Sequence, residues 1–153
     1  FLDLGTGPGT QAIHLAERGF KVTGVDLSEN AINKARKLSY QVNFIVDDIL
    51  NSKLGNKQFD YVFDRGCFHV LPVKERQKYV KEIKRILNDS GILFLKCFSI
   101  KETRDNGPHR FSKHEIKDIF GKDFVIESTV DTVYQGTLNP LPKALFTVMS
   151  KKK

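Results

Sequence analysis

"FLDLGTGPGT", residues 1–10, places Gly5, Gly7 and Gly9 directly behind a short apolar run. Glycine has no Cβ, so such a loop can turn tightly and approach a ligand closely. In an open parallel sheet, the turn after the first strand lies where ligands bind. A nucleotide-type ligand is therefore expected here, although the dinucleotide pattern GxGxxG would need a glycine where Thr10 stands. For the glycines taken alone, a purely structural tight turn remains the alternative.

The remaining chain shows strand and helix patterns in alternation. Apolar runs predict strands at residues 1–4, 21–25, 42–46, 59–63, 92–98, 124–130 and 143–149. Helical spacing predicts helices at residues 10–18, 29–38, 73–87 and 113–120. Ser28 is a good N-cap for the second helix, and NDSG, residues 88–91, is typical of a turn.

This alternation predicts the fold class. Parallel strands need crossover connections and helices supply them, so the sheet is expected to be covered on both faces. The last two strands are joined only by a loop that contains Gly and Pro, so they must be antiparallel neighbours. The predicted class is α/β, a doubly wound, mostly parallel seven-stranded sheet with a reversed C-terminal β-hairpin.

Length and composition favour one globular domain over residues 1–153. The chain is 40% hydrophobic and has 12 Phe, enough for a core. No run approaches the ~20 apolar residues of a membrane span, and no segment resembles a signal peptide, so a cytoplasmic protein is expected. Cys67 and Cys97 match neither a metal motif nor a disulfide framework, which favours reduced thiols and no metal site.

The formal net charge of +7 raises the question of nucleic-acid binding. The lysines are scattered among glutamates on predicted helix faces, and only Lys151–Lys153 form a run. A solvated basic surface is therefore favoured over a nucleic-acid footprint, and a nucleic-acid partner stays open as the less favoured interpretation.

The motifs resemble those of a known family. "LDLGTGPG" is similar to the cofactor loop of the class I S-adenosylmethionine-dependent methyltransferases. "VTGVDLS", "FIVDDI" and "FDYVFDRGCFHVLP" follow in the order and spacing of that family, and the likeness covers essentially the whole chain. The resemblance implies a Rossmann-like methyltransferase fold with S-adenosylmethionine as cofactor and S-adenosylhomocysteine as product.

The resemblance also implies which residues bind the cofactor. Asp3 would organise the loop and the cofactor's amino group, Asp26 would hold the ribose hydroxyls, and Asp48 would accept from the adenine amino group. The full implied set is Asp3, Gly5, Thr6, Gly7, Gly9, Asp26, Leu27, Asp48, Ile49 and Asp64. Each acid has a structural alternative as a turn or capping residue, but the ordered set favours cofactor binding.

A narrower likeness lies in "DRGCFH" and "CFSIKETRDNGPHRFS". Both resemble the branch that contains thiopurine S-methyltransferases and tellurite-resistance methyltransferases. This resemblance implies that Asp64 lies beside the methionine end of the cofactor and that Arg65 faces the acceptor. A salt bridge from Arg65 to Asp64 or Glu75 is the alternative. The N-terminal cap that closes over substrate in these relatives has no counterpart here, so a segment before Phe1 is expected.

The chemistry expected of this family needs little acid-base machinery for a soft acceptor. A thiol is already partly ionised near neutral pH, whereas an alcohol or amide would need a base. His69 and His109 are the candidate bases, with a surface role as the alternative for each. Cys67 lacks an activating partner in the sequence and is expected to be an inert thiol.

The sequence therefore predicts an enzyme that methylates a small-molecule acceptor, a thiol or another soft heteroatom. Its candidate catalytic residues are Arg65 and His69. An RNA or protein methyltransferase, a nicotinamide-dependent oxidoreductase and a non-catalytic cofactor-binding protein are the alternatives. The oligomeric state is not indicated.

Overall fold

The computed structural model describes all 153 residues of the chain. Seven strands form one sheet: β1 (Leu2–Leu4), β2 (Thr23–Asp26), β3 (Asn43–Val46), β4 (Phe59–Arg65), β5 (Leu87–Phe98), β6 (Phe124–Val133) and β7 (Lys143–Lys151). The helices are α1 (Thr10–Ala16), α2 (Glu29–Leu38), α3 (Val73–Ile86) and α4 (Lys113–Phe120), with short 3-10 helices η1 (Ile49–Asn51) and η2 (Phe68–Val70).

The strand order is β3-β2-β1-β4-β5-β7-β6, and β7 runs antiparallel to both of its neighbours. This confirms the predicted fold class, including the reversed hairpin. The chain passes from β1 outward to β3 and then returns to place β4 on the other side of β1. The order reverses at β1, so the glycine loop that follows β1 lies at the point where such sheets bind ligands.

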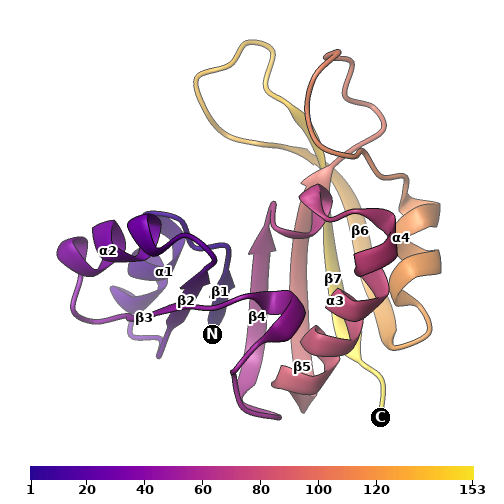
Figure 1. The fold of residues 1–153 in the computed structure, drawn as a ribbon. Coiled ribbons are helices and arrows are strands. Elements are labelled where there is room, and N and C mark those ends of the chain that lie inside the picture. The colour runs from indigo at the N-terminus through magenta and orange to yellow at the C-terminus, as the bar shows by residue number, and fades with distance from the viewer.

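Helices cover the sheet in two groups (Figure 1). Helices α1 and α2 pack against the half of the sheet formed by β1, β2 and β3. The small core there consists of Ala12, Val22, Ile32, Ala35, Val42 and Phe44. Helices α3 and α4 cover the β4–β7 side, where 22 buried residues form the main core. None of the helices has the length and apolar character that a membrane span requires.

Local sequence signals account for the helix starts. The Ser28 hydroxyl accepts a hydrogen bond from the Ala31 backbone N–H at 3.2 Å, as an N-cap does. Helix α4 begins with a capping box, because the Ser112 hydroxyl and the Glu115 carboxylate each accept from the other residue's backbone N–H. Sequence and structure agree on where these helices begin.

The turn predicted at residues 88–91 is wrong. Helix α3 ends at Ile86, and the chain enters β5 directly at Leu87. The pairing then jumps from Phe59↔Leu87 to Tyr61↔Ile92, so the NDSG residues form an irregularity inside the strand. A turn-forming composition is also compatible with a strand that bulges, because both need local departures from regular pairing.

Two long loops extend beyond the same end of the sheet, one after β5 and one between β6 and β7 (Figure 1). The first loop is closed at its base, where Ser99 bridges to Phe111 and the Phe111 N–H donates to the Phe98 carbonyl at 2.8 Å. The second begins at Tyr134, whose N–H donates to the Pro142 carbonyl at 2.8 Å. Both loops are therefore anchored beside the carboxyl end of β5.

Gly9 and Gly19 provide a test of how the first crossover packs. Both have left-handed backbone, with φ of 83° and 85°. A Cβ at Gly9 would lie 2.6 Å from the Phe44 ring, whereas a Cβ at Gly19 would meet nothing within 4 Å. We expect Gly19→Ala to cost about 1 kcal/mol of stability, the backbone penalty alone. Gly9→Ala should cost about 3 kcal/mol, because the overpacking penalty adds. Urea unfolding measures both, and equal losses would contradict the packing role of Gly9.

Candidate active site

Two adjoining cavities open at the carboxyl ends of β1, β2 and β4. The larger has a volume of about 640 Å³ and the smaller about 300 Å³, and both are lined by Leu4, Gly5 and Arg65. The larger is also lined by Val25, Asp26, Leu27, Asp47, Asp48, Ile49, Leu50, Gly66, Cys67, Val70, Leu71 and Glu75. The smaller is completed by Asp3, Thr6, Gly7, Pro8, Thr10, Gln11 and Tyr134. Together they form one two-part cleft of the size that small-molecule ligands occupy.

The glycines of the loop have two different roles: Gly5 and Gly7 border the cleft, and Gly9 allows close packing. Gly5 and Gly7 have φ of 67° and 54°, and a Cβ built at Gly7 would enter open space. Gly9 instead abuts Phe44 and Ala35, so it serves packing of the crossover. The Thr6 hydroxyl donates to Asp3 at 2.6 Å and is buried. Thr6 therefore shapes the loop from below, while Gly5 and Gly7 border the cleft.

Asp3 is a buried carboxylate at the floor of the smaller cavity. Burial raises the pKa of Asp3 to about 6, opposed by the hydrogen bond from Thr6 and raised further by the nearby charge of Asp64. The group therefore changes protonation just below neutral pH. A cation that entered the smaller cavity would stabilise its ionised form.

Asp26 closes β2 and ties the glycine loop to the second crossover. One carboxylate oxygen accepts from the Gly7 N–H at 2.9 Å, and the other accepts from the Ser28 N–H at 2.8 Å. Each carboxylate oxygen can accept a further bond, and Asp26 lines the larger cavity. The side chain is thus held in place with acceptor capacity left for a ligand.

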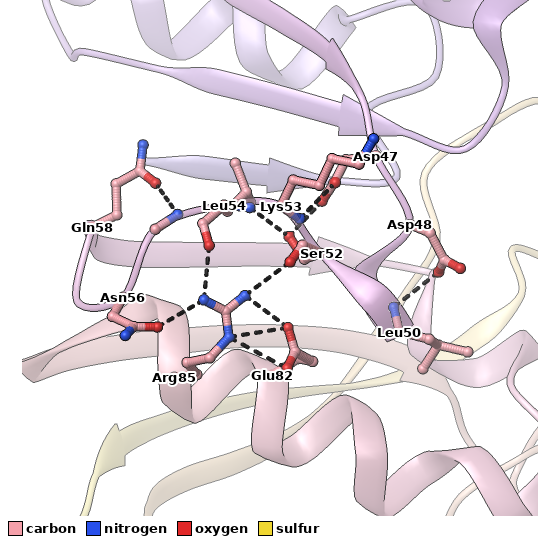
Figure 2. Close-up of polar contacts among 11 residues, drawn as sticks. Asp47, Asp48, Leu50, Ser52, Lys53, Leu54, Asn56, Gln58, Glu82 and Arg85 are labelled. Atoms are coloured by element: carbon pink, nitrogen blue, oxygen red, sulfur yellow. Dashed lines mark hydrogen bonds and ion pairs between the residues drawn. The ribbon is translucent and has the colours of Figure 1, made fainter.

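The two acids after β3 have different surroundings (Figure 2). Asp47 is buried, and its oxygens accept from the Ser52 hydroxyl and from the Lys53 N–H. Asp48 is exposed and accepts only from the Leu50 N–H at 2.9 Å, through one oxygen. The second oxygen of Asp48 is free, so this acid and not Asp47 is available to a ligand.

Arg85 is a residue that the sequence analysis missed. Its guanidinium reaches from α3 to the loop after η1, where it donates to the carbonyls of Leu54 and Ser52 and to Asn56 (Figure 2). Glu82 pairs with the same guanidinium at 2.8 Å. This clamp fixes the loop that follows the two acids. In the sequence, Arg85 looks like any cation on an amphipathic helix, because only the fold brings the loop to it.

Asp64 is fully buried beneath the cleft. Its oxygens accept from the backbone N–H groups of Gly66, Cys67 and Phe68 and from the Tyr79 hydroxyl, at 2.6–3.0 Å. Burial raises the pKa of Asp64, and these donors oppose the rise. All its acceptor positions face protein donors, so the direct ligand contact implied for Asp64 gives way to a positioning role.

Arg65 lies at the exposed end of β4, where the two cavities meet. It makes no ion pair with any carboxylate, which rules out the alternative of a bridge to Asp64 or Glu75 in this structure. Its guanidinium carbon lies 5.8 Å from the centroid of the Tyr134 ring. Lys96 Nζ lies 5.1 Å from the same centroid. Two cations therefore share one aromatic ring beside the smaller cavity.

No role was predicted from the sequence for Lys96 or Tyr134. Lys96 stands alone as a charge in the apolar run ILFLKCF, and that isolation was an available signal. Tyr134 carried no signal, because it follows a strand whose end was predicted three residues too early.

The geometry of His69 disagrees with a general base. The Phe98 N–H donates to its Nδ1 at 3.3 Å, so the proton of the neutral ring resides on Nε2. Burial lowers the pKa of His69 to about 4. His109 lies outside both cavities, with its ring against Phe111 and Nε2 3.3 Å from Glu115. Neither histidine is placed to take a proton from a ligand in the cleft.

Cys67 lines the larger cavity, but its environment does not activate it. Burial and the charges of Asp64, Asp26 and Asp48 all raise the pKa of the Cys67 thiol. No basic side chain hydrogen-bonds to the thiol, and no cluster of three or more His, Cys, Asp or Glu side chains could hold a metal ion. The thiol is protonated at neutral pH, which agrees with the expected inert role.

Comparison with known proteins identifies the family. The family model described as "Methyltransferase domain" matches residues 1–91. The chain belongs to the methyltransferase domain family. An uncharacterized methyltransferase of Schizosaccharomyces pombe is 36% identical over 118 residues, which cover 74% of this chain and 80% of that protein.

Two further comparisons involve proteins with named small molecules. A 2-heptyl-1-hydroxyquinolin-4(1H)-one methyltransferase of Mycobacteroides abscessus is 29% identical over 133 residues, 82% of this chain and 59% of that protein. The 1,6-didemethyltoxoflavin-N1-methyltransferase of Burkholderia thailandensis, solved with 1,6-didemethyltoxoflavin and S-adenosylhomocysteine, superposes with a TM-score of 0.78 at 22% identity. That superposition covers 99% of this chain and 70% of the other.

This methyltransferase has the class I fold, and S-adenosylmethionine is its methyl donor. The predicted family, enzyme class and cofactor are thus confirmed. The narrower likeness to thiopurine and tellurite-resistance enzymes stays a prediction.

Asp26 and Lys152 provide a test of the cofactor site. We expect Asp26→Ala to weaken S-adenosylhomocysteine binding at least about tenfold, because a charged acceptor is lost. Lys152→Ala should bind like the unmodified chain, since Lys152 is exposed and lies outside the cleft. Isothermal titration calorimetry measures both. Thermal unfolding of each variant checks that Asp26→Ala is folded at the titration temperature, and equal affinities would contradict the assignment.

Proposed function

We propose that this methyltransferase transfers a methyl group to a small planar acceptor through an acidic heteroatom, a thiol or a heteroaromatic hydroxyl. The observation that carries the proposal is the two-part cleft, with unshared carboxylate oxygens in its larger cavity and unpaired cations beside its smaller one. The carboxylates suit the hydroxyl and amino groups of a cationic donor, and the cations beside the smaller cavity suit an acceptor that enters as an acid.

The residues present fit the donor. Asp26 retains acceptor capacity for a diol, and Asp48 has one free oxygen for an amino group. Leu27 and Val70, which line the same cavity, are 72% and 64% exposed. Exposed apolar side chains at a cavity wall are typical of a ligand site, and a flat ring bound there would cover them. We infer that adenosine occupies the larger cavity, with Ile49 at the start of η1 offering its backbone N–H.

The smaller cavity fits the amino-acid end of the donor. Asp3 lies at its floor, and the open space above Gly7 admits a chain against bare backbone. A cationic amino group near Asp3 would be matched by the buried carboxylate. Gly5 and Gly7 would border the donor, while Thr6, Gly9 and Asp64 would support it from behind.

The relatives support a small-molecule acceptor. One is a 2-heptyl-1-hydroxyquinolin-4(1H)-one methyltransferase and another was solved with 1,6-didemethyltoxoflavin, and both small molecules contain a flat heteroaromatic ring system. Bound S-adenosylmethionine supplies an electrophilic methyl group: the acceptor forms the bond to carbon while the carbon–sulfur bond breaks and its electrons remain on sulfur. The protein then has to align the acceptor, exclude water and favour its ionised form. No histidine is placed as a base, which agrees with an acceptor that ionises readily.

A labelled-methyl transfer assay tests the acceptor class. The panel contains heteroaromatic thiols, heteroaromatic hydroxyls, simple alcohols and total RNA, each with labelled S-adenosylmethionine. Label should enter the thiols or the heteroaromatic hydroxyls and not the alcohols, because no base is available to ionise an alcohol. Transfer to RNA that weakens steeply with salt would instead favour the nucleic-acid alternative.

Asp3 predicts a pH dependence of S-adenosylhomocysteine binding. Because the pKa of Asp3 is raised to about 6, the free protein loses the charge of this carboxylate as the pH falls through 6. If the ligand's ammonium binds the ionised form, affinity should be constant near pH 8 and about tenfold weaker at pH 5. Asp3→Asn should bind weakly at both values, with a flat profile. A profile for Asp3→Asn parallel to that of the unmodified chain would contradict this role.

A further inference from the structure

We propose that Lys96, together with Arg65 and the ring of Tyr134, forms a subsite that binds the acceptor as an anion. The inference rests on the proposed function and names the charge state of its substrate. It is carried by the placement of two cations without counter-ions near one fixed aromatic ring. Arg65 and Tyr134 line the smaller cavity, and Lys96 lies beside Tyr134.

Strand pairing brings the two cations together. Arg65 and Lys96 are register partners on the parallel strands β4 and β5. Partners across adjacent strands project from the same face of a sheet, so these side chains lie side by side. Their charged groups lie 5.8 and 5.1 Å from the centroid of the Tyr134 ring. The cluster is built from three segments that are far apart in sequence.

The ring is held firmly in place. The Tyr134 hydroxyl donates to the Lys96 carbonyl at 2.8 Å, and its backbone N–H donates to Pro142. The Phe98 ring packs 5.0 Å from it. Burial raises the pKa of the Tyr134 phenol, so the ring stays neutral and does not compensate the cations. Tyr134 therefore offers a fixed π-surface near two positive groups.

The positive charge is not neutralised by the protein. Neither Arg65 nor Lys96 forms an ion pair. Burial, and to a lesser extent the charge of Arg65, lower the pKa of Lys96, as expected for a partly buried lysine beside a second cation. Of the nearby acids, Asp64 is engaged by four protein donors, and Asp3 is hydrogen-bonded to Thr6. An anionic ligand would relieve the repulsion and supply the missing counter-charge.

These features select the chemical class of the acceptor. A flat ring can lie against Tyr134, and an ionised oxygen or sulfur on it can meet the two cations. Positive charge also lowers the pKa of a bound acid, so the acceptor's proton leaves to solvent before methyl transfer. The subsite thus replaces a general base by electrostatic stabilisation of the ionised nucleophile.

Binding of 4-nitrophenol to the protein saturated with S-adenosylhomocysteine tests the subsite, because the phenolate absorbs visible light. The unmodified chain should bind the phenolate more tightly than neutral 4-nitroanisole and lower the pKa of the bound phenol. Lys96→Met should weaken phenolate binding about tenfold and remove the pKa shift, while Lys96→Arg retains both. Lys78→Met, an exposed lysine on α3, is the matched control and should change nothing.

Two variants of Tyr134 test the aromatic ring separately from the charge of Lys96. Tyr134→Leu should weaken binding of both aromatic probes, whereas Tyr134→Phe keeps the ring. The subsite would be overturned if both Lys96→Met and Tyr134→Leu kept normal phenolate binding. It would also be overturned if the unmodified chain bound the phenolate and 4-nitroanisole equally. Failure of the unmodified chain to bind S-adenosylhomocysteine would overturn the proposed function instead. Normal S-adenosylhomocysteine binding without any phenolate binding would refute this inference alone.

Discussion

The buried carboxylate of Asp64 is the interaction on which the site depends. It is fully excluded from solvent and accepts hydrogen bonds from three backbone N–H groups and one phenol. A buried carboxylate without such donors would cost several kcal/mol, so the chain after β4 must wrap around it. This wrapping turns the backbone at Gly66 and Cys67 and fastens it to α3 through Tyr79. Arg65, between the buried acid and the turn, is consequently directed outward.

The charges around the cleft are unevenly distributed. Carboxylates of β2 and the loop after β3 border its larger cavity, and the cations of β4 and β5 lie beside its smaller one. A positively charged methyl donor and an anionic acceptor would attract each other across such a cleft and lose charge together during transfer. Oriented charge of this kind acts before reaction and needs no proton movement within the protein. On the proposed function, such a site would serve an acidic acceptor without a free base.

Much of this organisation could be predicted from local patterns. The glycine loop, the acids after β2 and β3 and the alternation of strands with helices are all short-range features, because each is set by backbone freedom or by periodicity within one segment. The family resemblance implied Asp48 as the acceptor for the adenine amino group, and Asp48 has a free carboxylate oxygen whereas both oxygens of Asp47 accept from the protein. The prediction of a turn at residues 88–91 was wrong because turn-forming residues also occur where a strand has an irregularity.

The sequence by itself determined the fold class and the family. It also predicted the region where the donor would bind, because each motif follows a strand and the carboxyl ends of parallel strands lie at one edge of the sheet. Only the tertiary structure decided what each polar group is free to do. The oxygens of Asp64 accept hydrogen bonds from protein donors, and Nδ1 of His69 accepts from the Phe98 N–H. Arg65 lies near Lys96 and Tyr134 and forms no ion pair with an acid. Hydrogen-bond occupancy and charge pairing arise between segments distant in sequence, so no local pattern encodes them.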